Sequence, residues 1–144
     1  MKPKLTSLVR QSCCALMLAS VLGAAQARGT VLLIEPPRVQ LLNAEGKAPS
    51  VEAMRIAIVR AASQRQWTPR EDKPGEITLV FNKQNKHEVV VRISYDAGSY
   101  QISYVSSTNM KYELENGQAQ IHPFYNKWVA NLSSDITAQV QQSR

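Results

Sequence analysis

The feature of this sequence that constrains its fold most is a stretch of alternating apolar and polar residues between positions 67 and 112. Three runs, at 77–82, 89–95 and 100–105, place every second side chain on one face of a strand, and short polar turns join them. The stretch therefore predicts an antiparallel meander with one apolar and one polar face. The residues expected on the apolar face are Ile77, Leu79, Phe81, Val89, Val91, Ile93, Tyr95, Tyr100, Ile102 and Tyr104.

A shorter segment at 66–71 is expected to add an edge strand to this meander. It ends in Asp72-Lys73-Pro74-Gly75, a turn sequence in which proline presets one backbone dihedral angle and glycine accepts a positive φ. The predicted sheet therefore has three or four strands.

Two amphipathic helices flank the meander and are expected to cover its apolar face. The first begins after Pro49-Ser50 and ends near residue 65 or 66, with Glu52 in the first turn, where a negative charge favours the exposed amide dipoles. The second begins at Pro123, whose missing amide hydrogen costs nothing in a first turn, and continues for about five turns. Its expected apolar stripe is Phe124, Trp128, Val129, Leu132, Ile136 and Val140.

This pattern predicts one α+β domain at 49–142, a two-layer sandwich with both helices on one face of the sheet. An extended arm and loop at 28–48 precede it, and Pro36-Pro37 excludes the arm from the interior of a sheet. Two pairings are open for the apolar segment 31–34: with the sheet of its own chain or, by strand exchange, with that of a neighbour.

The first 27 residues have the three regions of a cleavable secretory signal. A positively charged start is followed by an apolar run at 12–25, and Ala25-Gln26-Ala27 has small residues at both positions that signal peptidase reads. Cleavage after Ala27 places the mature protein in the periplasm or outside the cell. The apolar run is shorter than the roughly 20 residues that span a bilayer, so no stable membrane span is expected after cleavage.

Both cysteines, Cys13 and Cys14, lie in this signal and leave with it, so the mature chain is expected to contain no disulfide and no thiolate metal site. Lipid anchoring is the weaker interpretation, because the charged sequence Arg10-Gln11-Ser12 precedes Cys13 too early in the apolar run.

The charge balance argues against a nucleic-acid partner. The sequence has 17 Lys and Arg against 11 Asp and Glu, and three of the basic residues, Lys2, Lys4 and Arg10, belong to the signal. The remaining excess is far from the dense basic stripe that nucleic-acid binding requires, although it permits contact with an anionic envelope polymer. The two histidines are too few for a metal site, and no motif indicates a cofactor.

Four segments carry a resemblance to a known family. They are Arg65-Gln66-Trp67, Asp72-Lys73-Pro74-Gly75, and the stretches at 95–104 and 121–128. The chain resembles, from about residue 51 to 136, a family of small uncharacterised envelope proteins of Proteobacteria that includes lipoproteins. The resemblance implies an exported α+β domain. The family has no established activity, so it implies no catalytic residues.

An enzymatic interpretation would begin with His122 as a general base oriented by Asp96, Glu113 or Glu115. The simpler interpretation, which we favour, is that His122 helps to satisfy the free amides at the start of the last helix. No catalytic residue is therefore assigned.

Two groups of residues could bind a ligand: the polar run 106–112 and the aromatic residues near the last helix. Hydroxyl and amide side chains in such a run either bind a ligand or bond to their own backbone. Trp128 is expected in the core, whereas Tyr125 and Asn126 are expected to reach the surface. The candidate binding residues are Ser107, Asn109, Tyr112, His122, Tyr125 and Asn126.

These observations favour an exported, non-catalytic binding or interaction module whose partner is another envelope protein or an anionic envelope polymer. The alternative is a small envelope hydrolase or a hydrolase inhibitor. A binding module should present an exposed sheet edge or apolar patch, whereas a hydrolase should present His122 in a pocket beside a carboxylate.

Overall fold

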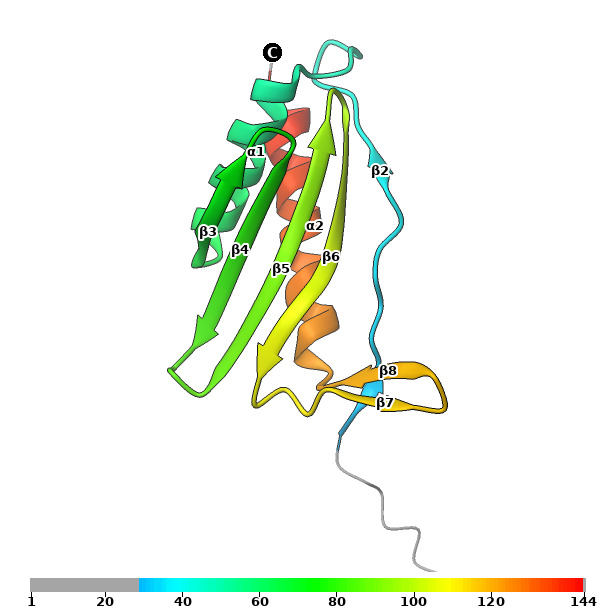
Figure 1. The fold of residues 1–144 in the computed structure, drawn as a ribbon. Coiled ribbons are helices and arrows are strands. Elements are labelled where there is room, and N and C mark those ends of the chain that lie inside the picture. The colour runs from blue at the N-terminus through cyan, green and yellow to red at the C-terminus, as the bar shows by residue number, and fades with distance from the viewer. Residues whose placement is uncertain (1–28, 144) are drawn as a thin grey trace, which may run out of the picture.

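The computed structural model describes residues 29–143, so the predicted signal at 1–27 lies outside the described residues. This part of the chain has the α+β fold, with two helices, a five-stranded antiparallel sheet and a three-stranded antiparallel sheet (Figure 1). The elements are β1 (Val31–Leu32), β2 (Val39–Gln40), α1 (Val51–Gln64), β3 (Trp67–Lys73), β4 (Glu76–Lys83), β5 (His87–Asp96), β6 (Ser99–Thr108), β7 (Glu113–Glu115), β8 (Gln118–Ile121) and α2 (Phe124–Gln141).

The large sheet has the strand order β2-β6-β5-β4-β3, and β3 to β6 form the predicted meander. The alternating pattern sets the register, because a one-residue slip would turn every apolar side chain to the wrong face. Ile77 pairs with Ile93, which pairs with Ile102, and all three side chains are buried. The edge strand β3 is longer than expected and contains a bulge between Pro69 and Glu71.

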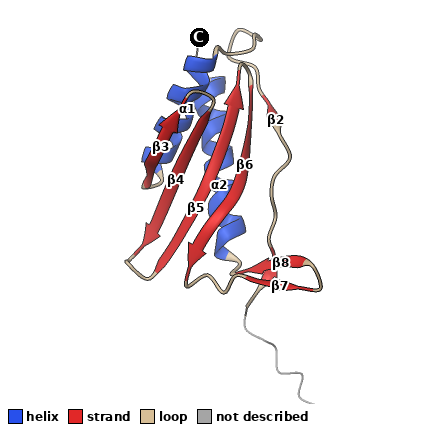
Figure 2. Ribbon diagram, in the orientation of Figure 1, coloured by secondary structure: helices blue, strands red, loops and turns tan. Residues whose placement is uncertain are grey.

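Both helices lie on the same face of the large sheet (Figure 2). As predicted, α1 begins after Ser50, whose side chain accepts a hydrogen bond from the Ala53 amide at 3.1 Å. The sheet is tied to α2 by Tyr100, whose buried hydroxyl donates to the Ser133 carbonyl oxygen at 3.0 Å.

The buried stripe of α2 differs from the prediction. It consists of Tyr125, Val129, Leu132, Ile136 and Val140, so Tyr125 takes the place expected for Phe124. Residues four, seven and eleven positions apart lie on one face of a helix, and Tyr125 is in phase with Val129 and Ile136. Phe124 is consequently half exposed and Trp128 is only partly buried.

A second sheet, β1-β8-β7, is present that the sequence did not predict. The arm pairs with its own chain at both ends: Val31 pairs with Ile121 of β8, and Val39 pairs with Tyr100 of β6. Between these pairings the arm passes through Pro36-Pro37, which cannot donate backbone hydrogen bonds. There Glu35 replaces a backbone partner, because its carboxylate accepts the Tyr104 amide at 2.9 Å.

The β6 strand bends at a bulge beside the arm. Val90 pairs with Ser106 and Val91 with Tyr104, which leaves Val105 as the additional residue. Tyr104 and Ser107 therefore approach each other, and their hydroxyls are 3.0 Å apart.

Candidate functional site

The polar run 106–112 makes contacts within the chain. Ser107 bonds to the Tyr104 hydroxyl, and Asn109 donates from its side chain to the Lys86 carbonyl oxygen at 2.7 Å. Tyr112 stacks on Tyr104, with ring centroids 4.8 Å apart and an interplanar angle of 11°. Three of the candidate binding residues thus have a structural contact of their own.

His122 has the role predicted by the simpler interpretation. Its Nδ1 accepts a hydrogen bond from the Phe124 amide at 3.2 Å, at the start of α2. Burial lowers the pKa of His122, and the nearby His87 and Lys111 act in the same direction. Asp96, one of the carboxylates considered as its partner, lies instead beside Arg38 and Ser99 at the β5–β6 turn.

Tyr125 and Asn126 differ from their expected placement at the surface. The Tyr125 side chain is 0% exposed, and its hydroxyl has no hydrogen-bond partner among residues 29–143. Asn126 is partly buried and holds the arm: its side-chain oxygen accepts the Ile34 amide at 3.0 Å, and its side-chain nitrogen donates to the Leu32 carbonyl oxygen at 2.8 Å.

A cleft of about 320 Å³ lies where the end of α1 and the start of β3 meet the end of β4 and the first half of α2. We call it the tryptophan cleft, because both tryptophans of the sequence, Trp67 and Trp128, line it. Phe81 lies between them, with ring centroids 5.3 Å from Trp67 and 4.8 Å from Trp128. The inner wall of the cleft is therefore aromatic, with Trp67 and Phe81 buried in the core and Trp128 partly exposed.

The cleft residues are placed by four elements. Gln66 links α1 to β3 with a φ of 62°, and this left-handed turn directs the chain from the helix into the strand. On β4, Phe81 and Lys83 are two residues apart and share a face. On α2, Trp128 and Asn131 are three residues apart and are neighbours on the helix surface.

The rim of the tryptophan cleft is cationic. Arg65, Lys83 and Lys127 line it, and no Asp or Glu does. Arg65 is paired with Asp135 of α2, which raises the pKa of Arg65 through a side-chain hydrogen bond. The side-chain ammonium groups of Lys83 and Lys127 form no hydrogen bond or ion pair with any other described residue. Two cations are thus left for a ligand.

The remaining lining residues are the carboxamides Gln64, Gln66 and Asn131. Carboxamides donate and accept hydrogen bonds, aromatic faces stack on rings, and lysines bind anions. The lining contains no His, Cys, Ser, Tyr or carboxylate. These side chains can stack on, hydrogen-bond to and pair with a ligand.

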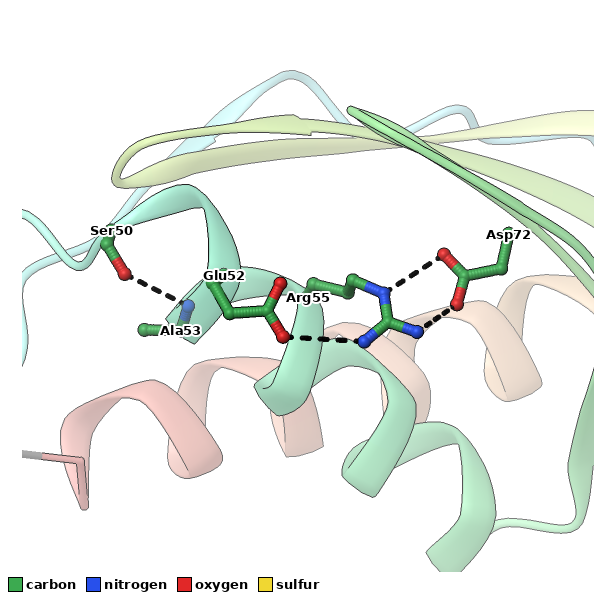
Figure 3. A network of polar contacts seen from close by, with 5 residues as sticks. All are labelled: Ser50, Glu52, Ala53, Arg55 and Asp72. Atoms are coloured by element: carbon green, nitrogen blue, oxygen red, sulfur yellow. Dashed lines mark hydrogen bonds and ion pairs between the residues drawn. The ribbon is translucent and has the colours of Figure 1, made fainter.

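A second recess, of about 310 Å³, differs in that its charges are already paired. In Figure 3, Arg55 of α1 reaches both carboxylate oxygens of Asp72 on β3, and Glu52 approaches the same guanidinium at 3.5 Å. The hydrogen bond to Asp72 raises the pKa of Arg55. This network joins α1 to the end of β3. The remaining charged residue of the recess, Lys73, is paired with Glu71, so every charged side chain in the lining already has a partner.

Sequence reasoning missed the tryptophan cleft because Trp128 was assigned to the core. A signal was present: each tryptophan follows polar or basic residues, in Gln64-Arg65-Gln66-Trp67 and in Asn126-Lys127-Trp128. Trp67 is buried in the core in spite of these neighbours, whereas the partly exposed Trp128 combines an apolar body with polar surroundings, as tryptophans at binding surfaces do.

No protein-family model matches this chain, and no curated protein matches it significantly. Within residues 29–143, no helix is both long and apolar enough to cross a membrane. In the same range, no three His, Cys, Asp or Glu side chains are grouped as metal ligands.

Proposed function

We propose that this chain is an exported, non-catalytic binding protein of the bacterial envelope, and that the tryptophan cleft binds an acidic saccharide of an envelope polymer. One observation carries the proposal: the side-chain ammonium groups of Lys83 and Lys127 have no partner in the described chain and line, with Trp128, a cleft without carboxylates. The signal-like first 27 residues and the family resemblance support the location.

The ligand class follows from the three kinds of side chain. A sugar ring presents an apolar face that stacks on an aromatic ring, and its hydroxyls match the three carboxamides. A carboxylate on the sugar would pair with the two lysines through charge-assisted hydrogen bonds. A neutral sugar would leave both cations unpaired, and a simple anion would leave the aromatic wall unused.

The proposal is tested by titration of tryptophan fluorescence, since both tryptophans are in the cleft. The full chain is expressed and the purified protein is titrated with tetragalacturonic acid or, as a neutral control of equal length, maltotetraose. We expect the acidic saccharide alone to bind, with the affinity decreasing at higher salt. In the Lys83→Gln/Lys127→Gln variant, affinity should fall by about tenfold or more.

The matched control is Lys47→Gln/Arg60→Gln, which removes two charges away from the cleft and should bind as the parent does. If neither saccharide binds, or if both double variants bind equally well, the proposal is wrong. Release of reducing ends during the same incubation would instead support the alternative of a small envelope hydrolase.

A further inference from the structure

The aromatic wall of the tryptophan cleft continues beyond it as a row of rings. The centroid of Trp128 is 5.7 Å from that of Phe124, Phe124 is 4.7 Å from His122, and His122 is 6.2 Å from His87. The row runs from the start of α2 to the start of β5, so it crosses from the helical layer to the end of the sheet.

Phe124 is the exposed part of this row. Its side chain is 50% exposed, although it lies in an amphipathic helix whose other large apolar residues are buried or half-buried. Its backbone position is fixed, because its amide donates to His122. Because it contacts both Trp128 and His122, this exposed ring extends the apolar surface of the cleft instead of standing alone.

The two histidines that end the row have one ring nitrogen each engaged within the chain. Nδ1 of His122 accepts the Phe124 amide, so the neutral ring carries its proton on Nε2. Nδ1 of His87 lies 2.9 Å from the Asn109 carbonyl oxygen and donates to it, which leaves Nε2 as an acceptor. The row therefore ends with a donor and an acceptor suited to hydroxyl groups.

A recess of about 220 Å³ lies beyond His87, and Asn82, Asn85, Lys86 and Asn109 help to line it. Like the tryptophan cleft, this recess has a cationic side chain, Lys86, and carboxamides close to an aromatic ring, that of His87. Unlike the cleft, the recess also has a carboxylate, that of Glu88, which forms an ion pair with Arg70 at 3.5 Å.

We infer that the binding surface extends from the tryptophan cleft across Phe124 to His122 and His87, so that the ligand is a linear acidic oligosaccharide of several rings. This inference rests on the proposed function of the cleft. Three successive ring contacts beyond Trp128 form a path longer than one sugar ring, and binding at linked positions along a path increases affinity without any change in the first position.

The test compares chain lengths on two proteins. Mono-, di- and tetragalacturonic acid are titrated against the parent and against Phe124→Ala, with fluorescence as the readout. We expect the parent to bind the tetramer at least about tenfold more tightly than the monomer. Phe124→Ala should lose most of this gain while its affinity for the monomer is unchanged. Leu114→Ala, at a 69% exposed residue of β7 outside the row, is the matched control and should behave as the parent.

Nuclear magnetic resonance of the unmodified parent gives a readout that does not depend on a variant. The tetramer should shift the signals of Phe124 and the ring of His122, whereas the monomer should shift only those of the cleft. If the parent binds monomer and tetramer equally, or if the tetramer leaves His122 unshifted, the extended surface is wrong and the cleft proposal stands. If no saccharide binds at any length, both proposals are wrong.

Discussion

Gly98 and Gly117 have nearly the same backbone conformation, with φ of 76° and 77°, but different surroundings. A Cβ at Gly98 would lie 3.0 Å from the Ala48 Cβ and 3.3 Å from the Leu41 carbonyl oxygen, whereas nothing lies within 4 Å of one at Gly117. Both positions favour glycine, but only Gly98 lies against the arm.

We therefore predict that Gly98→Ala lowers the free energy of unfolding by about 2–3 kcal/mol and Gly117→Ala by about 1 kcal/mol. Urea denaturation of both variants measures the difference, which reports the steric contact with the arm. Equal losses would show that the arm yields to the added methyl group.

Tyr125 is the second residue whose surroundings give a prediction. Its buried hydroxyl lacks a partner among the described residues, and an unpaired buried hydroxyl is destabilising. Tyr125→Phe should therefore raise the free energy of unfolding by about 1 kcal/mol at neutral pH. Tyr112→Phe, at an exposed ring, is the control and should change it little.

The pH dependence of stability gives a further test at the same residue. The pKa of Tyr125 is raised, mainly by burial and then by Glu35 and Tyr104, so the folded state holds this proton more tightly than the unfolded state does. A phenol in an unfolded chain titrates near pH 10, so this contribution is present below about pH 10 and is lost as the pH rises above it. Thermal melts from pH 8 to 11 should show a smaller alkaline loss for Tyr125→Phe than for the parent; identical alkaline losses would contradict the prediction.

Whether a side chain is buried could be predicted where the apolar residues recur regularly. It could not be predicted at the ends of an apolar stripe on a helix. Ile77, Ile93 and Ile102 are buried as expected, because alternation in three neighbouring strands is unambiguous. Tyr125 and Phe124 are adjacent on α2, and both are aromatic, so composition could not decide which faces the sheet. The packing of Tyr125 against Tyr104 of β6, at 5.6 Å, decides it in the structure.

Among the elements, the arm depends on one side chain of α2. Asn126 satisfies the Ile34 amide and the Leu32 carbonyl oxygen, so Asn126→Ala removes two hydrogen bonds at once. We predict that this variant loses about 2 kcal/mol of stability and that the amides of 31–34 exchange faster with deuterium. Asn131→Ala controls for the higher helix propensity of alanine, since the Asn131 side chain makes no hydrogen bond with another described residue. Unchanged exchange in the arm would show that its strand pairings suffice to hold it.

The long elements were predictable from the sequence, whereas the short strands were not. The two helices and the strands β3 to β6 have enough residues for a period to be read, and their order was predicted correctly. The strands β1, β2, β7 and β8 have two to four residues each. β1 and β2 depend on partners distant in sequence, such as Ile121 for Val31, which no local pattern reveals. β7 and β8 pair with each other across Asn116-Gly117, but their runs are too short for a period to be read. The tryptophan cleft is also formed by residues distant in sequence, since four elements contribute to it.

At the scale of the whole molecule, the two sheets differ in how they are protected. The large sheet is covered by both helices, whereas all three residues of β7 are exposed. We predict that the β1-β8-β7 sheet opens without global unfolding, so that the amides of β7 and β8 exchange with deuterium orders of magnitude faster than that of Ile93 in the core. Equal protection of both sheets under native conditions would contradict this prediction.

The arm also determines how the domain would respond to a pull. It enters beside β7 and β8, and the chain ends at the opposite end of the molecule, where the Ala44 amide donates to the Ser143 carbonyl oxygen at 3.1 Å (Figure 1). A pull on the N-terminal side would load the pairing of β1 with β8 and the Asn126 contacts first, and the pairing of β2 with Ser99 and Tyr100 of β6 after them. The arm would therefore bear a mechanical load before the tryptophan cleft does, because no residue of the arm lines the cleft.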